Sequence, residues 1–136
     1  MKDIKKSGFQ FSNPETKELV FRKNQDFDKE KYKGLPISYN IESSEIEGNS
    51  AELSLIVEIG MEGQETPFYL KMTISSGFSW EEEAENISKK LLKQNAVTLL
   101  MGYARPLIAH LTVDAGYKPL NLPFVDLRED IKNMEE

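Results

Sequence analysis

The sequence contains no cysteine and a single histidine, His110. Without cysteine there is no disulfide framework, no thiolate metal site and no cysteine nucleophile, which agrees with a reducing compartment. One histidine without a neighbouring pair of carboxylates cannot build a closed metal site or a histidine-based triad. We therefore expect His110 to be an ordinary helix residue, and the protein to need no metal and no cofactor.

Glycine-rich phosphate loops and acid-base clusters are missing as well. Gly60, Gly63 and Gly77 lie in or beside turns between antiparallel strand patterns, which is the wrong setting for a P-loop or a dinucleotide fingerprint. The cluster of residues 81–83, all glutamate, falls where a helix N-terminus favours negative charge, with no apolar pocket to raise a pKa. We expect no enzymatic activity.

Basic residues are fewer than acidic ones. The chain has 136 residues with 17 basic and 23 acidic side chains, so its net charge of -6 repels phosphate backbones, and nucleic acid is not an expected ligand. The segment 1–6 is basic overall but leads into Ser7-Gly8-Phe9-Gln10 rather than an apolar stretch. We therefore expect no secretory signal, no membrane insertion and a cytoplasmic protein. The length fits a single domain over residues 1–136.

Four stretches of sequence carry strand patterns. Residues 9–24 form a first strand interrupted at residues 13–15, because Pro14 cannot donate to a sheet ladder. Apolar and polar residues then alternate over 35–42, 51–61 and 67–75. Because all strands precede the helices, the pattern favours an α+β fold, a four-stranded antiparallel meander with helices on one face.

Two capping boxes predict where helices begin. Residues 79–82 would start a first helix, a joint would follow at Gln94-Asn95, and the main helix would run from Ala96 to Ala115. Residues 126–129 would open a short C-terminal helix.

Glycine and proline shape the main helix. Gly116 would stop it. Pro106 cannot donate to the carbonyl of Gly102, so we expect a kink there.

The main helix is apolar on two adjoining faces, and a small sheet can cover one of them. The second face would then need a partner subunit, as would the apolar side of the first strand at the sheet edge. The predicted oligomer interface is Leu19, Phe21, Leu100, Met101, Ala104, Leu107, Ile108 and Leu111.

One run of sequence resembles the SecB export chaperones. Its elements are Tyr103-Ala104-Arg105 on a helix, Gly116, and Pro119-Leu120-Asn121-Leu122-Pro123 running into Val125-Asp126-Leu127. The resemblance extends more weakly to residues 16–19 and 76–79. It implies an eight-stranded sheet formed across the first strands of a dimer, with long helices sandwiched between two dimers.

The resemblance also implies a groove for unfolded polypeptide and a docking surface for the SecA motor. The implied groove residues are Ile37, Tyr39, Ile41, Phe78, Trp80, Leu120, Leu122, Phe124, Leu127 and Ile131. The implied docking positions are Glu18, Arg22, Tyr69 and Lys71. Because the family's docking surface is acidic, Arg22 and Lys71 reverse the expected charge, and such reversals can cost several kcal/mol.

We therefore predict an ATP-independent holdase that binds non-native polypeptides in apolar grooves, with protein export as one use. The alternative is a binding protein of the same fold dedicated to one partner, for example an antitoxin or an inhibited target. The motor partnership stays open because of the two charge reversals.

Overall fold

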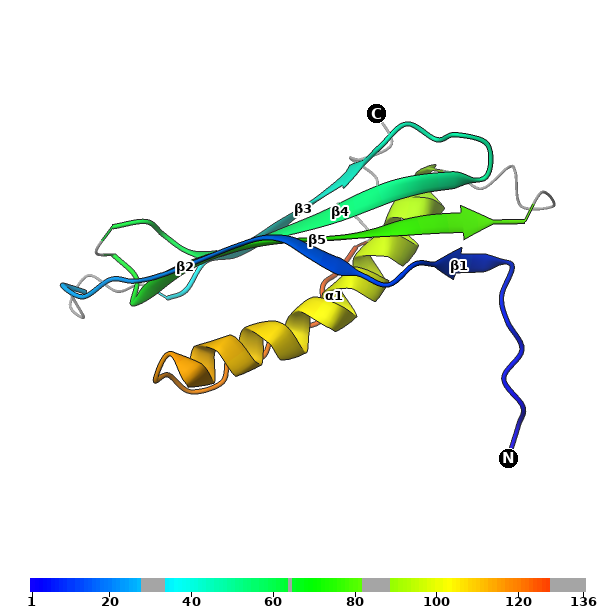
Figure 1. Ribbon diagram of the computed structural model, residues 1–136. Helices are drawn as coiled ribbons and strands as arrows, with labels where there is room; N and C mark the ends of the chain where they lie inside the picture. Colours follow the sequence, from blue (N-terminus) through cyan, green and yellow to red (C-terminus); the bar gives the residue numbers. More distant parts are fainter. Residues whose placement is uncertain (28–33, 64, 82–88, 128–136) are drawn as a thin grey trace.

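The computed structural model describes residues 1–27, 34–63, 65–81 and 89–127 (Figure 1). In this part of the chain an antiparallel sheet lies against one long helix. The elements are β1 (Phe9–Phe11), β2 (Glu15–Lys23), β3 (Ile37–Ser43), β4 (Ser50–Gly60), β5 (Phe68–Trp80) and α1 (Lys89–Asp114). The architecture is the α+β arrangement that the order of strand and helix patterns predicts.

The sheet is a meander over only three of its strands. Strands β3, β4 and β5 are consecutive antiparallel neighbours, but β2 pairs with β5 rather than β3, with Phe21 opposite Leu70. The prediction of a simple meander is therefore wrong for the first strand. β5 is 13 residues long and pairs with β4 on one edge and with β1 and β2 on the other, while β3 is an outer strand of the sheet.

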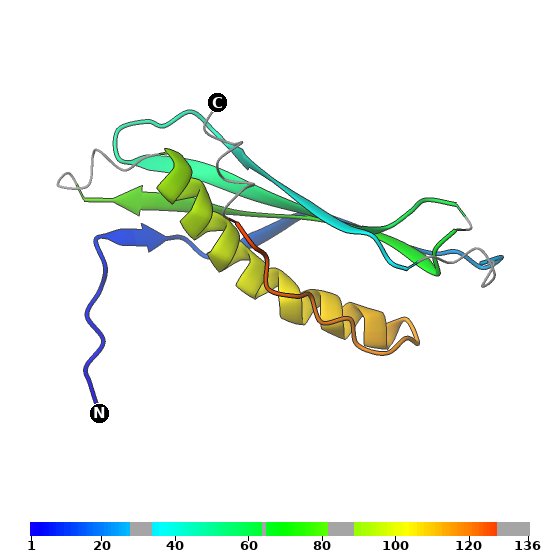
Figure 2. The same ribbon diagram turned by 180° about the vertical axis from the view of Figure 1, so that it is seen from behind.

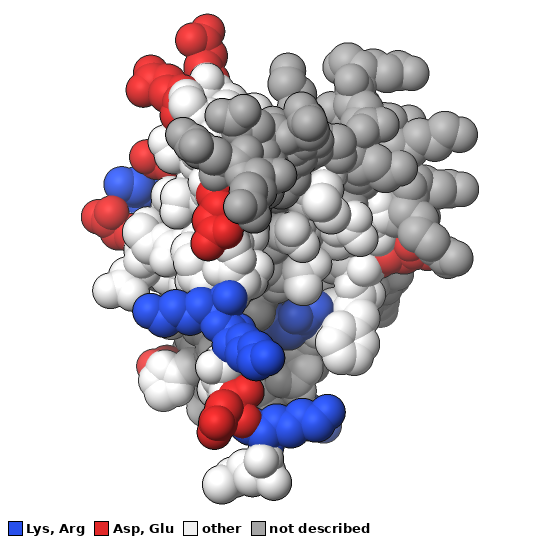
Figure 3. All heavy atoms as spheres, turned by 90° about the vertical axis from the view of Figure 1, so that its right-hand side faces the viewer, with Lys and Arg blue, Asp and Glu red and all other residues white. Residues whose placement is uncertain are grey.

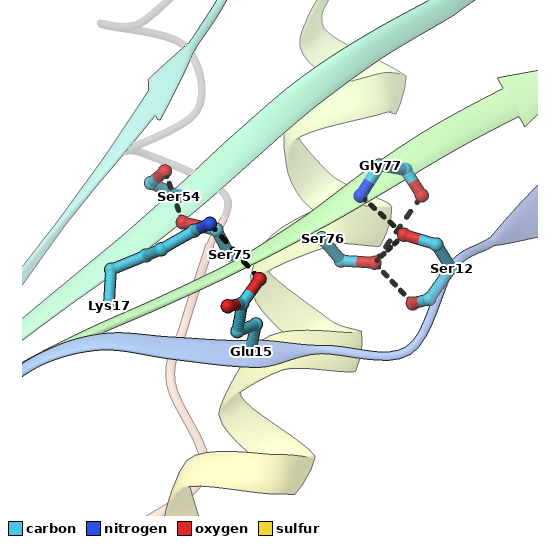
Figure 4. Close-up of polar contacts among 7 residues, drawn as sticks. All are labelled: Ser12, Glu15, Lys17, Ser54, Ser75, Ser76 and Gly77. Atoms are coloured by element: carbon cyan, nitrogen blue, oxygen red, sulfur yellow. Dashed lines mark hydrogen bonds and ion pairs between the residues drawn. The ribbon is translucent and has the colours of Figure 1, made fainter.

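The predicted first strand is two strands, so the sheet has five strands rather than four within the described residues. β1 and β2 both pair with β5, and the chain between them is held by Ser12 (Figure 4). The Ser12 amide donates to the Gly77 carbonyl over 2.8 Å, the Gly77 amide donates to Ser12 Oγ over 2.9 Å, and Ser76 Oγ donates to the Ser12 carbonyl. One main-chain bond and two bonds to serine side chains thus hold the chain where the sequence breaks before Pro14.

The core lies between α1 and the sheet. Alternate residues of β4 point at the helix, and Leu53, Leu55 and Val57 have no exposed surface. From α1, Leu100 and Ile108 are equally buried. Burial of this kind is the main favourable term in folding, roughly 25 cal/mol per Å² of apolar surface.

The helix boundaries differ from the prediction at the N-terminal side. Ser79 and Trp80 belong to β5, since the alternation of β5 continues through Phe78 and buries Trp80. A strand therefore occupies the start of the predicted capping box. α1 also runs without a break through Gln94-Asn95, so the predicted joint is wrong.

The C-terminal end of α1 is confirmed at the predicted glycine. Gly116 has φ +94° and follows the last helical turn. The Tyr117 amide donates to the Thr112 carbonyl over 2.9 Å and the Gly116 amide to the Val113 carbonyl over 3.0 Å, which is the Schellman arrangement. Both views show α1 changing direction along its length (Figures 1 and 2), as expected of a helix that contains Gly102 and Pro106.

After Gly116 the chain turns back and runs along α1 without regular secondary structure (Figure 2). We call residues 117–127 the strip. Tyr117 fixes its start, because its hydroxyl donates to the Pro67 carbonyl over 3.1 Å and its ring contacts Phe68. The predicted C-terminal helix, which would open at residues 126–129, lies outside the described part of the chain except for Asp126 and Leu127, which have no regular secondary structure.

By length and composition alone, Leu91–Asp114 could also cross a membrane, with a mean hydropathy of 1.3. The sequence-based expectation was that no such span exists. The sheet covers one face of this helix and 39% of the 18-residue apolar window is buried inside the fold, so packing against the sheet accounts for part of its apolar character.

Candidate functional site

An apolar cavity of about 220 Å³ opens between β3, α1 and the strip. Ile37 and Tyr39 lie on the helix-facing side of β3, directly opposite Ile59 and Val57 of β4. The strip closes the other side. The cavity is lined by Ile37, Tyr39, Val57, Met101, Leu122, Pro123, Phe124 and Val125. We call it the edge cavity.

Large apolar side chains are exposed at this cavity. Phe124 has 94% of its surface exposed and Ile37 has 41%, whereas Leu122 between them has 6%. Phe124 and Ile37 line the same apolar cavity and so form one continuous apolar surface with it, and surfaces of this kind mark sites that bind other molecules. Leu122 therefore anchors the strip to the core, and Phe124 remains free to contact something outside the chain.

A second apolar cavity of about 130 Å³ lies on the helix side of the strip. It is lined by Val97, Thr98, Met101, Arg105, Phe124, Val125 and Leu127. We call it the inner cavity. The two cavities share Met101, Phe124 and Val125, so the strip separates them at residues 124–125.

Polar side chains of α1 hold the strip. Thr112 Oγ1 accepts a hydrogen bond from the Leu120 amide over 2.9 Å. Arg105 donates from Nε to the Leu122 carbonyl over 3.3 Å and from Nη2 to the Pro123 carbonyl over 3.1 Å. Its guanidinium carbon also lies 5.2 Å from the centre of the Phe124 ring, within cation–π range.

The structure brings together four of the predicted groove residues, Ile37, Tyr39, Leu122 and Phe124, at the edge cavity. Leu127 lines the inner cavity, and Leu120 is half-buried against the core. Residues that sequence reasoning missed are Val57, Met101, Pro123 and Val125. Pro123 and Val125 belong to the strip motif itself, whereas Val57 is brought there by its register opposite Tyr39, which no local pattern reports.

The other predicted groove residues do not face this cavity. Phe78 and Trp80 are 1% and 6% exposed and pack with Phe9, which covers them when β1 pairs with the end of β5. Ile41 is 5% exposed and lines a different hollow beside Leu92. Ile131 lies outside the described residues.

Half of the predicted oligomer interface is core in this chain. Leu100, Met101, Ala104 and Ile108 are at most 4% exposed because the chain's own sheet covers them, so their assignment to a subunit interface is wrong for this conformation. The remaining predicted interface residues keep free surface. Leu19 and Leu107 are exposed, while Phe21 and Leu111 are half-buried.

The four predicted docking positions lie on the sheet face opposite α1. Arg22 is directly opposite Tyr69, and Glu18 forms an ion pair with Lys71 over 3.7 Å. Arg22 pairs with Glu62 over 3.5 Å. Both cations that reverse the expected charge are thus paired within the chain, at exposed sites where such pairs contribute little stability.

Tyr69 is the buried member of this face. Its hydroxyl donates to the Glu58 carboxylate over 3.1 Å. Burial, and then that hydrogen bond, raise the pKa of Tyr69 above its ordinary value of 10.0. Ser54 and Ser75 form a further hydroxyl pair at 2.6 Å on the same face (Figure 4). The face is therefore a polar surface with satisfied partners.

A further hollow, about 650 Å³ and partly acidic, lies where the β3–β4 turn meets the ends of β1 and β5. Its lining includes Glu45, Glu47 and Glu52. Figure 3 views this end of the molecule and shows acidic side chains above and basic ones lower down, at the level of the N-terminal segment. Within the described residues, no three His, Cys, Asp or Glu side chains are placed to hold a metal ion.

His110 pairs with a neighbour on its own helix. Its Nε2 lies 3.3 Å from an Asp114 carboxylate oxygen, and both side chains are exposed. This is the ordinary position for a helix-surface histidine.

Solved structures share this fold. One is the SecB-like chaperone Rv1957 of Mycobacterium tuberculosis in complex with a peptide from the antitoxin HigA1, with a TM-score of 0.64 and 12% identity over 86% of this chain and 90% of that one. Another is a protein of unknown function from Streptococcus agalactiae, with a TM-score of 0.51 and 11% identity over 85% and 97%. These likenesses show that the chain has the same fold as a SecB-like chaperone.

The sequence itself matches the family described as preprotein translocase subunit SecB over residues 8–130. The chain belongs to the SecB family. Among curated proteins it is similar to the uncharacterized protein MJ0357 of Methanocaldococcus jannaschii, with 28% identity over 96% of this chain and 87% of that protein.

Proposed function

We propose that the protein is an ATP-independent holdase, which captures non-native polypeptide at the edge cavity and releases it without bond chemistry. The observation that carries this proposal is the exposed Phe124 beside an apolar cavity that Ile37 and Leu122 also line. Apolar side chains of an unfolded chain would be buried there at roughly 25 cal/mol per Å², before ordering costs are subtracted. Recognition by apolar burial is broad, so many unrelated clients would bind.

The test is suppression of aggregation of a slowly refolding client by a stoichiometric excess of the purified protein. We expect delayed refolding and reduced light scattering. Phe124→Ser should weaken this effect, whereas Met61→Ser, which removes a similarly apolar exposed side chain at the β4–β5 turn, should leave it unchanged. Unchanged aggregation in the presence of the wild-type protein would contradict the proposal.

A second candidate is a binding protein of the same fold dedicated to one partner. The likeness to a SecB-like chaperone solved with an antitoxin peptide favours it. Affinity capture with the intact protein separates the two, because a holdase retains many unfolded chains and a dedicated binder retains a single native partner or one short segment of it.

We further propose that the chain forms a homo-oligomer, as a dimer of dimers. Leu19 at the β2 edge and Tyr103 and Leu107 on the outer side of α1 offer exposed apolar surface to other subunits. Several cavities in one assembly would add avidity for a long client. The mass in solution, measured by light scattering, tests this directly.

Protein export is a further proposed use of such a holdase, with the SecA motor docking at Glu18, Arg22, Tyr69 and Lys71. Glu62 and Glu18 are paired with Arg22 and Lys71 of that face, so their negative charge is offset and the face offers the motor little acidic surface. We propose a cytoplasmic site of action, without membrane insertion and without nucleic acid as a partner. Binding of purified motor protein to the wild type, compared with Arg22→Glu, would test the docking positions.

A further inference from the structure

Two polar residues of α1 point toward the strip from the same side of the helix. Arg105 and Thr112 are seven residues apart, which is two turns and a rise of about 10 Å. Thr112 binds the strip at Leu120, and Arg105 binds it at Leu122 and Pro123. The strip therefore runs antiparallel to α1, in agreement with its course in Figure 2.

The strip depends on such side chains because it belongs to no sheet or helix. Its backbone groups need partners, and Pro119 and Pro123 have no amide hydrogen to offer. The carbonyls of Leu122 and Pro123 receive their hydrogen bonds from one guanidinium. That group also lies over the ring of Phe124, so Arg105 contacts three consecutive residues of the strip. We call these three contacts the clamp.

The clamp acts on the part of the strip that borders both cavities. Leu122, Pro123 and Phe124 line the edge cavity, and Phe124 also lines the inner cavity together with Arg105 itself. Because α1 and the strip together line both cavities, a shift of these residues relative to α1 would change the shape of both. The clamp thus acts on both cavities at once.

We propose that Arg105 is a positioning residue that holds the strip at the distance from α1 that shapes the client site. This inference rests on the proposed function for its binding consequence, but not for its structural one. When the strip is already held in place, no conformational entropy is lost in ordering it as a client binds. Removal of the clamp should therefore lower the affinity for the client. We expect a loss of about tenfold.

Lysine cannot replace arginine at this position. Its ammonium is a point charge, whereas the planar guanidinium donates from two nitrogens at once and stacks on a ring. Arg105→Lys, which keeps the charge, should therefore behave like Arg105→Gln. Lys118→Gln is the matched control, because it removes an exposed positive charge from the same strip without touching the clamp.

The absence of cysteine allows a direct measurement of strip position. Cysteines introduced at exposed Asn121 in the strip and exposed Asn40 in β3 carry spin labels, and electron paramagnetic resonance gives the distribution of distances between them. We expect a narrow distribution in the otherwise wild-type chain and in Lys118→Gln, and a broad one in Arg105→Gln and Arg105→Lys.

The binding arm uses a reduced and carboxymethylated protein as a permanently unfolded client. Its Kd should rise about tenfold in Arg105→Gln and stay unchanged in Lys118→Gln. Thermal unfolding of each variant separates a lost clamp from a lost fold. If Arg105→Gln does not fold, Phe124→Leu removes only the ring contact and should broaden the distance distribution partially.

Each outcome decides the proposal. An unchanged distribution in Arg105→Gln, or in Phe124→Leu where that variant replaces it, overturns the clamp. A broad distribution with an unchanged Kd overturns the role in binding. If the wild type binds no unfolded client, the holdase proposal fails, and the spin-label distances still decide whether Arg105 positions the strip.

Discussion

The two sides of α1 are built on different principles. Toward β4 and β5 the helix presents Leu100, Ala104 and Ile108, which are completely buried against alternating apolar residues of the sheet. Toward β3 and the strip it presents Arg105 and Thr112, which bind backbone groups and leave apolar cavities beside them. One helix thus packs tightly in the core on one side and, on the other, holds the strip in a position that leaves cavities beside it.

The difference follows from the directionality of the two interactions. Apolar packing stabilises in proportion to the area removed from water, so it favours contact without gaps. A hydrogen bond fixes two groups at a set distance and does not require the neighbouring volume to be filled. Polar tethers are therefore suited to holding a wall open beside an apolar space that a ligand could occupy.

The largest effect is expected on the packed side. Leu100→Ala removes a fully buried side chain and should lower the free energy of unfolding by about 3 kcal/mol. Val113→Ala is the matched control on the same helix, because its side chain is 48% exposed, and should cost well under about 1 kcal/mol. Chemical denaturation measures both. Equal costs would contradict the one-sided burial of α1.

A smaller effect is expected where the wall is tethered. Thr112→Val keeps the shape of a fully buried side chain but deprives the Leu120 amide of its acceptor, which should cost about 2 kcal/mol. The Leu120 amide should also exchange with solvent faster. Thr98→Val, at an exposed position of the same helix, should leave both quantities unchanged.

The sheet face opposite α1 carries a hydrogen bond, from Tyr69 to Glu58, that can be compared with the bonds made by α1. Tyr69→Phe removes the bond to Glu58 and should cost about 1 kcal/mol at neutral pH. Because the pKa of Tyr69 is raised in the fold, its contribution is fully present below the unfolded pKa of about 10 and is lost as pH rises through the folded pKa. The gap between wild type and Tyr69→Phe should therefore shrink above pH 10; a gap constant with pH would refute this assignment.

The smallest effect on stability is expected at the edge cavity, where binding should change instead. Ile37→Ala truncates a 41% exposed side chain and should cost under about 0.5 kcal/mol in unfolding free energy. The Kd for an unfolded client should nevertheless rise severalfold. Ile46→Ala, 40% exposed in the β3–β4 turn, should change neither. If Ile37→Ala and Ile46→Ala bind the client with similar Kd, the edge cavity is not the client site.

Local patterns predicted much of the fold and part of the site. Alternation located β3, β4 and most of β5, and Gly116 was correctly identified as the end of α1. The strip motif identified the family and two of the residues at the edge cavity, Leu122 and Phe124. The strand patterns and the helix end depend on neighbours in sequence, through side-chain period and backbone geometry, so the sequence alone specifies them. Leu122 and Phe124 were instead assigned through the resemblance to the SecB family.

Pairing and coverage were decided by the tertiary structure. The sequence marked the break near Pro14, but only the sheet shows that β1 and β2 both lie along β5, and that Phe9 then covers Phe78 and Trp80. Periodicity showed two apolar faces on α1 without saying which one the sheet would bury. The clamp at Arg105 likewise joins residues 17 and 18 positions apart, because a chain that turns back on itself brings groups together that no local pattern relates.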